Sequence, residues 1–252
     1  MSNRFSCALN GISPESLDSA IRVTDLTELP PVCRVVTAPT LRHGLMLLRR
    51  VRESLTVRVS FVLAEHDPSR RRELLSRLHA WADPGGVLTT SDRPGQQLTV
   101  VCDTLPMLSA LCWTDEVQLE FTAYGVPFWE SAEETHVTTT AGAALLLPGT
   151  ADECPVGVIV AHTGSAPLTS LTLQCGDTQM TFEGLSLSPG GVFTLAVTDG
   201  LLHADADGES VLMKRTGDSH DLLLADCGEE TPVAVSADQP VSAVFHGRGR
   251  LL

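Results

Sequence analysis

The sequence has few of the features that define several common functional classes. Lysine occurs once among 17 basic residues, against 31 acidic residues, and the net charge is −14. Tight binding of nucleic acid or of an anionic membrane needs clustered positive charge, so we expect neither. No apolar run approaches the roughly 20 residues that cross a bilayer, and residues 1–7 lack the apolar segment of a secretion signal. We therefore expect no association with a membrane. We also expect the protein to be made in a cytoplasm.

The seven cysteines follow no pattern of a known cysteine site. No pair has the C-x-x-C spacing of a zinc knuckle or a thioredoxin motif. An odd number of cysteines without a secretion signal is typical of a protein that folds in a reducing cytoplasm. We expect most of these residues to act as small buried hydrophobic side chains.

Motifs for catalysis and for cofactor binding are absent as well. The sequence contains no G-x-S-x-G nucleophile motif, no H-E-x-x-H zinc motif and no glycine-rich phosphate loop. Spacing alone does not test whether carboxylates from distant strands form a glycosidase pair. We predict no catalytic residue, no cofactor and no metal.

One acidic segment, residues 203–209, resembles a calcium loop only in part. An EF-hand has an acid at its first position and Glu at its twelfth, whereas these positions hold His203 and Lys214. The segment with Asp205 and Asp207 is therefore predicted to be a hairpin turn with solvated carboxylates. A weak cation site there stays open.

Charge and aromatic residues divide the sequence into two parts. Residues 1–130 have a net charge of −2 and contain eight of the eleven aromatic residues. Residues 131–252 have a net charge of −12 and contain neither Trp nor Tyr. The sequence therefore predicts two domains, 1–130 and 131–252.

The first part is predicted to be mainly β with one α-helix. Asp67 and Pro68 form a helix start, after which Leu74, Leu78 and Trp81 share one face. The arginines on the other faces either meet water or contact another subunit. Alternating apolar and polar residues indicate strands, at residues 55–61, 98–100 and 117–123.

The second part is predicted to be β throughout, with turns at the spacing of an all-β sandwich or jelly roll. Glycine-containing turns separate the apolar segments, and no helix of useful length is expected. The candidate strands are residues 156–161, 168–175, 180–185, 192–197, 211–213, 221–224 and 241–245.

Several short features follow one another along the sequence in an informative order. They are a first strand that ends in Asn-Gly, the strand near residue 60, the capped helix that ends in Trp81, a D-x-P-G turn before a strand, and a closing Pro-Phe-Trp. These features occupy residues 5–11, 55–63, 67–81, 92–98 and 126–129.

In this order, the features resemble the N-terminal domain of the distal tail proteins of long-tailed bacteriophages, and the second part resembles the galectin-like β-sandwich that follows in that family. The resemblance covers essentially the whole chain. It implies a β-sandwich or split-barrel-like first domain, a galectin-like second domain and no enzymatic activity. It further implies a hexameric ring in the virion that joins the tail tube protein to the tail-tip and tail-fibre hub and lets DNA pass in transit.

The segment 42–52 is predicted to take part in the contacts between subunits. It combines apolar residues with Arg42, Met46, Arg49, Arg50 and Arg52, and both Met and Arg are enriched at protein interfaces. We expect a projecting hairpin or arm between two strands. The alternative is an ordinary strand pair whose leucines face the core and whose arginines face water.

A carbohydrate-binding sandwich for attachment to the host surface is the alternative function. Galectin-like folds often bind glycans, but such sites usually stack a sugar on Trp or Tyr. The second part has neither residue, so its fold alone does not indicate this function.

Overall fold

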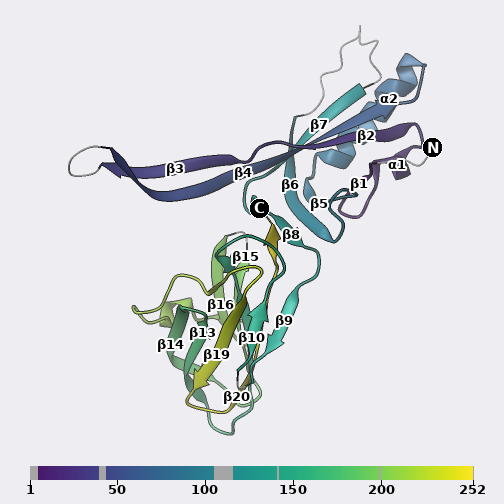
Figure 1. Ribbon diagram of the computed structural model, residues 1–252. Helices are drawn as coiled ribbons and strands as arrows, with labels where there is room; N and C mark the ends of the chain where they lie inside the picture. The colour runs from purple at the N-terminus through teal and green to yellow at the C-terminus, as the bar shows by residue number, and fades with distance from the viewer. Residues whose placement is uncertain (1–4, 40–43, 105–115, 141, 199, 252) are drawn as a thin grey trace. The chain divides into compact units, whose positions relative to one another are not determined.

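The computed structural model describes residues 5–39, 44–104, 116–140, 142–198 and 200–251 (Figure 1). The chain divides into two compact units, Met1–Trp129 and Glu130–Leu252, which are described separately below. Among the described residues, no helix is both long enough and apolar enough to cross a membrane.

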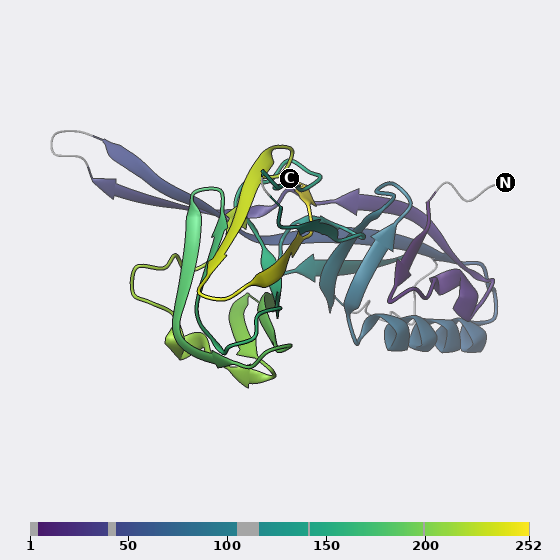
Figure 2. The same cartoon turned by 90° about the horizontal axis from the view of Figure 1, so that it is seen from below.

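The first unit is an antiparallel sheet with one long helix against it (Figure 2). Its sheet has the strand order β1-β5-β6-β7-β4-β2, and β3 pairs with β4. The elements are β1 (Cys7–Leu9), α1 (Pro14–Leu17), β2 (Ile21–Glu28), β3 (Val32–Pro39), β4 (Leu45–Leu63), α2 (Pro68–Ala82), β5 (Gly86–Thr90), β6 (Gln96–Thr104) and β7 (Glu116–Ala123); β8 (Trp129–Ser131) crosses the division between the units.

Helix α2 confirms the helix predicted from the sequence. The Asp67 side chain caps it by accepting a hydrogen bond from the backbone N–H of Ser69 at 3.2 Å. Trp81 then packs edge-on against Phe61 and Phe121, with ring centroids 6.2 and 5.8 Å apart. The apolar face of the helix is therefore buried against strands β4 and β7.

Two arginines of α2 form ion pairs within their own unit. Arg70 forms ion pairs with Asp18 at 2.6 Å and with Glu73 at 2.7 Å. Arg77 forms an ion pair with the same Glu73 at 2.6 Å. These hydrogen bonds and charges lower the pKa of Glu73. The pairs connect α2 to the end of α1.

The D-x-P-G turn and the closing Trp of the first unit meet in space. Trp129 is buried, and its indole N–H donates to Glu28 at 2.9 Å. Arg93 from the turn forms an ion pair with the same carboxylate oxygen at 2.7 Å and lies over the Trp129 ring. The three side chains fix the end of the first unit to β2.

A second contact holds the start of the chain against β5. Asn10 has a φ of 52°, and its side chain donates to the Gly85 carbonyl and accepts from the Val87 N–H, both at 2.9 Å. The Asn10 amide lies where a Cβ on Gly86 would be. Gly86 also has a φ of 127°, which side chains rarely allow. Both features require glycine at this position.

The second unit consists of two antiparallel sheets and a short strand pair. One sheet has the order β10-β19-β13-β14 and the other β17-β16-β15-β12-β20-β9, while β11 pairs with β18. The elements are β9 (Thr135–Thr138), β10 (Ala144–Leu146), β11 (Cys154–Pro155), β12 (Gly157–His162), β13 (Leu168–Cys175), β14 (Thr178–Leu187), β15 (Val192–Thr198), β16 (Leu201–Ala206), β17 (Glu209–Ser210), η1 (Leu212–Lys214), β18 (Leu224–Ala225), β19 (Glu230–Ala237), β20 (Val241–Gly247) and β21 (Arg250–Leu251).

The two larger sheets share one apolar core. Phe182 of β14 and Phe193 of β15 are fully buried, and their ring centroids are 5.0 Å apart. Leu173 and Phe245 are buried as well, one from each sheet. This packing of sheet on sheet confirms the predicted fold class, which was mainly β with a sandwich in the second part.

Some strand predictions in the second unit were wrong. Residues 212–214 form a 3-10 helix instead of the strand expected at 211–213, and only Leu224 of the segment 221–224 lies in a strand. Residues 230–237 form β19, which was not predicted, although its apolar residues alternate. Pro232 interrupts that pattern, and proline is uncommon within strands.

Replacing Gly86 tests the contact between Asn10 and β5. We expect Gly86→Ala to lower the free energy of unfolding by about 1–3 kcal/mol, because it introduces backbone strain and a collision with the Asn10 amide. Gly125→Ala is the matched control, since Gly125 has open space around it and no positive φ. Urea unfolding monitored by circular dichroism measures both variants. Equal stability of the two variants would contradict this role.

We predict that the two units unfold separately, because each has its own core. Calorimetry of the full chain should show two transitions. Gly86→Ala should lower only one of them, and Phe182→Ala only the other, the latter by about 3–5 kcal/mol. A single transition that moves with both substitutions would contradict the division into independent domains.

Candidate assembly interface

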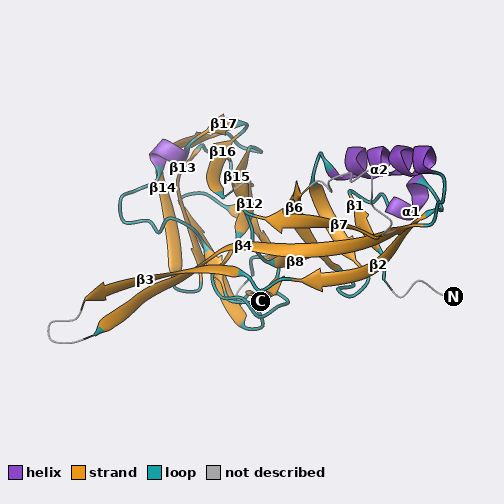
Figure 3. Cartoon of the chain, turned by 90° about the horizontal axis from the view of Figure 1, so that it is seen from above, coloured by secondary structure: helices purple, strands orange, loops and turns teal. Residues whose placement is uncertain are grey.

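The most unusual surface of the first unit is a two-stranded ribbon, which we call the arm. It consists of β3 and residues 45–54 of β4, paired antiparallel from Val32 opposite Ser54 to Pro39 opposite Leu45. Figures 1 and 3 show the arm extending well beyond the other strands of its unit. The rest of β4 lies between β2 and β7.

The arm exposes large apolar side chains on both of its faces. Neighbouring residues of a strand point to opposite faces, yet Leu45, Met46, Leu47 and Leu48 are all exposed, with Leu45 at 69% and Leu47 at 62%. On β3, three valines are exposed in the same way: Val32, Val35 and Val36.

The same strand behaves differently within the sheet. From Leu55 onward, every second residue of β4 is buried, including Phe61 beneath α2. Between them, Arg58 forms an ion pair with Glu120 on β7 at 2.6 Å. The change occurs where β4 leaves the sheet, so the arm's apolar residues have no core of their own unit to enter.

The structure describes four of the five predicted interface residues, which lie at different points along the arm. Met46 and Arg50 are exposed on it, and Arg49 lies in β4 opposite Val36. Arg52 lies near the base, where its guanidinium group donates to the Pro127 carbonyl at 3.3 Å and lies 4.7 Å from the Phe128 ring centroid. Arg42 falls outside the described residues.

The predicted position of this segment in the fold needs a correction. Residues 45–52 do not lie between two strands, because they are the first half of the 19-residue strand β4. Sequence analysis also missed β3 and its exposed valines. The signal for an apolar surface on both faces of the arm was the run 45–48 in β4, since four consecutive apolar residues cannot all face one side of a strand.

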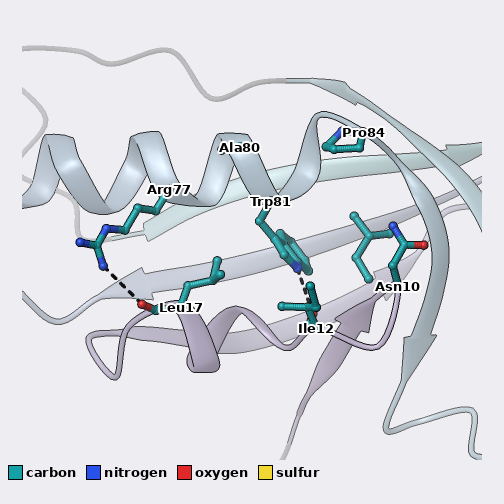
Figure 4. A pocket seen from close by; sticks show the side chains of 8 residues that line it. Asn10, Ile12, Leu17, Arg77, Ala80, Trp81 and Pro84 are labelled. Atoms are coloured by element: carbon teal, nitrogen blue, oxygen red, sulfur yellow. Dashed lines mark hydrogen bonds between the residues drawn. The ribbon is translucent and has the colours of Figure 1, made fainter.

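A pocket of about 490 Å³ lies beside α2 in the first unit (Figure 4). Trp81 and Arg77 line it, and both are already engaged: the indole N–H donates to the Ile12 carbonyl at 2.9 Å, and Arg77 donates to the Leu17 carbonyl at 3.5 Å. The Asn10 side chain is engaged with β5, as described above. The pocket therefore offers an apolar wall with few free polar groups.

The acidic segment at residues 203–209 is a hairpin turn. Asp207 and Gly208 both have positive φ and connect β16 to β17. The Asp207 carboxylate accepts a hydrogen bond from the Val192 N–H at 2.8 Å. Within the described ranges, no group of three or more His, Cys, Asp or Glu side chains is arranged to hold a metal ion.

A polar cluster in the second unit contains Glu134, His136 and His246. The His246 Nδ1–H donates to Glu134 at 2.8 Å, and the two imidazole rings stack with centroids 5.8 Å apart. Burial raises the pKa of Glu134, but the hydrogen bond and positive charge of His246 outweigh burial, with help from Arg248 and His136. The net pKa is lowered. This arrangement connects β9 to β20.

The fold is similar to that of two solved phage structures. SPP1 Dit, described as a paradigm of the hub adsorption apparatus in phages that infect Gram-positive bacteria, matches with a TM-score of 0.70 at 14% identity, covering 97% of this chain and 98% of that one. A chain of the phage P2 baseplate matches with a TM-score of 0.50 at 6% identity, covering 98% and 99%. The chain has the fold of a distal tail protein.

The predicted resemblance is therefore confirmed at the level of the fold and over nearly the whole length. Sequence comparison does not reach it, since no protein-family model and no curated protein matches this sequence. The two neighbours are structural proteins of phage particles.

The Glu134 pair should make stability depend on pH. Because the folded-state pKa of Glu134 is lowered, its contribution is present above the ordinary Glu pKa of about 4.3 and is lost as the pH falls through the lower folded value. We expect Glu134→Gln to destabilise the protein at pH 6 but much less at pH 3. Urea midpoints at both pH values measure this, with the exposed Glu133→Gln as control. A constant deficit at both pH values would contradict it.

Proposed function

We propose that this protein is a structural component of a long-tailed bacteriophage virion, with no enzymatic activity. It is made in the cytoplasm of the host bacterium and sits at the distal end of the tail. There, six copies form a ring that joins the tail tube protein to the tail-tip and tail-fibre hub, and its lumen continues the path of the DNA. The likeness to SPP1 Dit over 97% of the chain supports this assignment.

We infer that the first unit holds the ring together and that the arm makes the contact. The observation that carries this inference is the set of seven large apolar residues that the arm exposes. Contiguous exposed apolar surface marks protein contacts in soluble proteins. A second copy of the chain can cover the apolar side chains of the arm. The same contact between neighbouring copies is then repeated six times, as a closed ring of six requires.

The charge distribution supports the same arrangement. The first part is close to neutral, with a net charge of −2, so copies of it can approach one another without strong electrostatic repulsion. The second part, with a net charge of −12, repels its own copies, so we propose that it does not form the ring contacts. Acidic protein also binds DNA poorly, which suits a channel that DNA passes through.

The second unit is proposed to be a galectin-like sandwich that acts as a structural module. Residues 131–252 contain neither Trp nor Tyr on which a sugar ring would stack. We therefore do not assign carbohydrate binding to it.

Two matched double variants test the role of the arm. Leu45→Glu with Leu47→Glu places two charges on the arm, whereas Leu201→Glu with Met213→Glu places two charges on apolar residues of the second unit that are also well exposed, Leu201 at 65% and Met213 at 97%. Exposed substitutions usually change stability by less than about 0.5 kcal/mol, so both proteins should fold. We expect the arm variant to lose the ring and the control to keep it.

Electron microscopy and light scattering of the purified proteins measure the assemblies. Wild-type protein that stays monomeric at high concentration would contradict the ring, whereas a full ring formed by the arm variant would contradict only the role of the arm.

The Arg50→Glu variant tests the contribution of charge to the contact made by the arm. Its effect on assembly should weaken as salt is added, because screening reduces the contribution of exposed charges.

A further inference from the structure

Two cysteines of the second unit lie in direct contact. Cys154 belongs to β11, and Cys227 follows β18, the strand that pairs with β11. Their Sγ atoms are 3.0 Å apart, about 1 Å more than the length of a disulfide bond. The backbone N–H of Cys227 donates to the Ala151 carbonyl at 3.0 Å, so hydrogen bonds of the main chain hold the two cysteines together.

The surroundings of the two sulfur atoms differ. Cys154 is fully buried, whereas Cys227 is partly exposed and its Sγ accepts a hydrogen bond from the Arg250 N–H at 3.2 Å. The hydrogen bond from Cys154 lowers the pKa of Cys227 to about 6 against the opposing effect of burial, and the Arg250 N–H adds to the lowering. The same contact raises the pKa of Cys154. Cys227 therefore carries the more acidic thiol of the pair.

The other buried cysteines offer a contrast. Burial raises the pKa of Cys175 to about 12, and burial together with the charge of Glu15 does the same for Cys7. These thiols stay protonated near neutral pH and behave as the small hydrophobic residues that the sequence predicted. The Cys154–Cys227 contact is not apparent from sequence spacing, because 72 residues separate the two cysteines.

We propose that Cys154 and Cys227 form a thiol–disulfide switch, reduced in the cytoplasm and oxidised to a disulfide by low-molecular-weight disulfides outside it. The geometry supports this, because bond formation needs the sulfur atoms to approach by only about 1 Å. Cys227, the partly exposed member of the pair, is the thiol that an external disulfide can reach.

The chemistry proceeds in two exchanges. The Cys227 thiolate attacks one sulfur of oxidised glutathione, which forms a mixed disulfide and releases one glutathione thiolate. That thiolate takes the proton of Cys154, and the Cys154 sulfur then attacks Cys227 Sγ and releases the second glutathione. In sum, two protein thiols and one oxidised glutathione give one protein disulfide and two reduced glutathiones.

The bond would connect two distant parts of the sequence within the second unit. Closing a loop of more than 70 residues restricts the unfolded chain strongly and therefore stabilises the folded state. We expect the melting temperature of the second unit to rise by roughly 5–15 °C on oxidation. The switch would make this unit more stable after the particle leaves the reducing cytoplasm.

The test uses the full-length protein incubated with oxidised glutathione at pH 7.5 and then returned to dithiothreitol. Mass spectrometry of the intact chain should show the loss of two hydrogen atoms, reversed by the reductant. Chymotrypsin cuts after leucines between Cys154 and Cys175, and should yield one cross-linked peptide pair that contains Cys154 and Cys227. Calorimetry should show the rise in melting temperature.

Two variants complete the design. Cys33→Ser removes a cysteine of the arm and should leave the cross-link and the thermal shift unchanged, whereas Cys227→Ser should abolish both. Wild-type protein that stays reduced, stops at a glutathione adduct or links other cysteines would overturn the proposal. Because the wild-type measurement needs no variant, a Cys227→Ser protein that fails to fold leaves the test intact.

Discussion

Strand β4 sets the main constraint on the first unit, because one strand of 19 residues serves two environments. Its second half lies between β2 and β7, with Phe61 buried beneath α2. Its first half pairs with β3 in a ribbon of two strands. Such a ribbon has no interior, so its apolar side chains stay in water unless another molecule covers them. Position along β4 therefore decides whether a leucine belongs to a core or to a surface.

Local sequence signals were sufficient for much of the fold. Helix α2 was predictable because Asp67 caps it, Pro68 starts it, and Leu74, Leu78 and Trp81 share one face. The second half of β4 was predictable because its apolar residues alternate. These signals act within a few residues of each other, and the structure keeps them because local preference and tertiary packing agree.

Signals that depend on distant partners were harder to detect. The run at residues 45–48 resembles a buried segment in sequence. Its side chains are exposed because the two-stranded arm has no core of its own to bury them. Arg52 carried the same charge signal as Arg50, yet its guanidinium group lies over Phe128 in its own unit. The Cys154–Cys227 contact depends on the pairing of β11 with β18. Spacing along the chain contains none of this information.

Several polar groups of the first unit complete its fold. Glu28 binds Trp129 and Arg93, Arg58 binds Glu120, and Asn10 binds the backbone of β5. Buried or half-buried polar groups that are satisfied in this way rigidify a structure. What the unit offers to other molecules is surface, and the arm is where that surface is apolar.

An exposed apolar ribbon also carries a risk, since flat strand edges pair with unintended chains. The arm has two features that oppose this. Its register shifts between Val32 and Cys33 and again between Val36 and Thr37, and such irregularities twist a strand edge. Arg34 and Arg50 are exposed beside its apolar residues, and forked Arg contacts favour one orientation over others. The exposed apolar area then attracts the arm to a partner surface. The register shifts and the charges restrict this binding to a partner of matching shape.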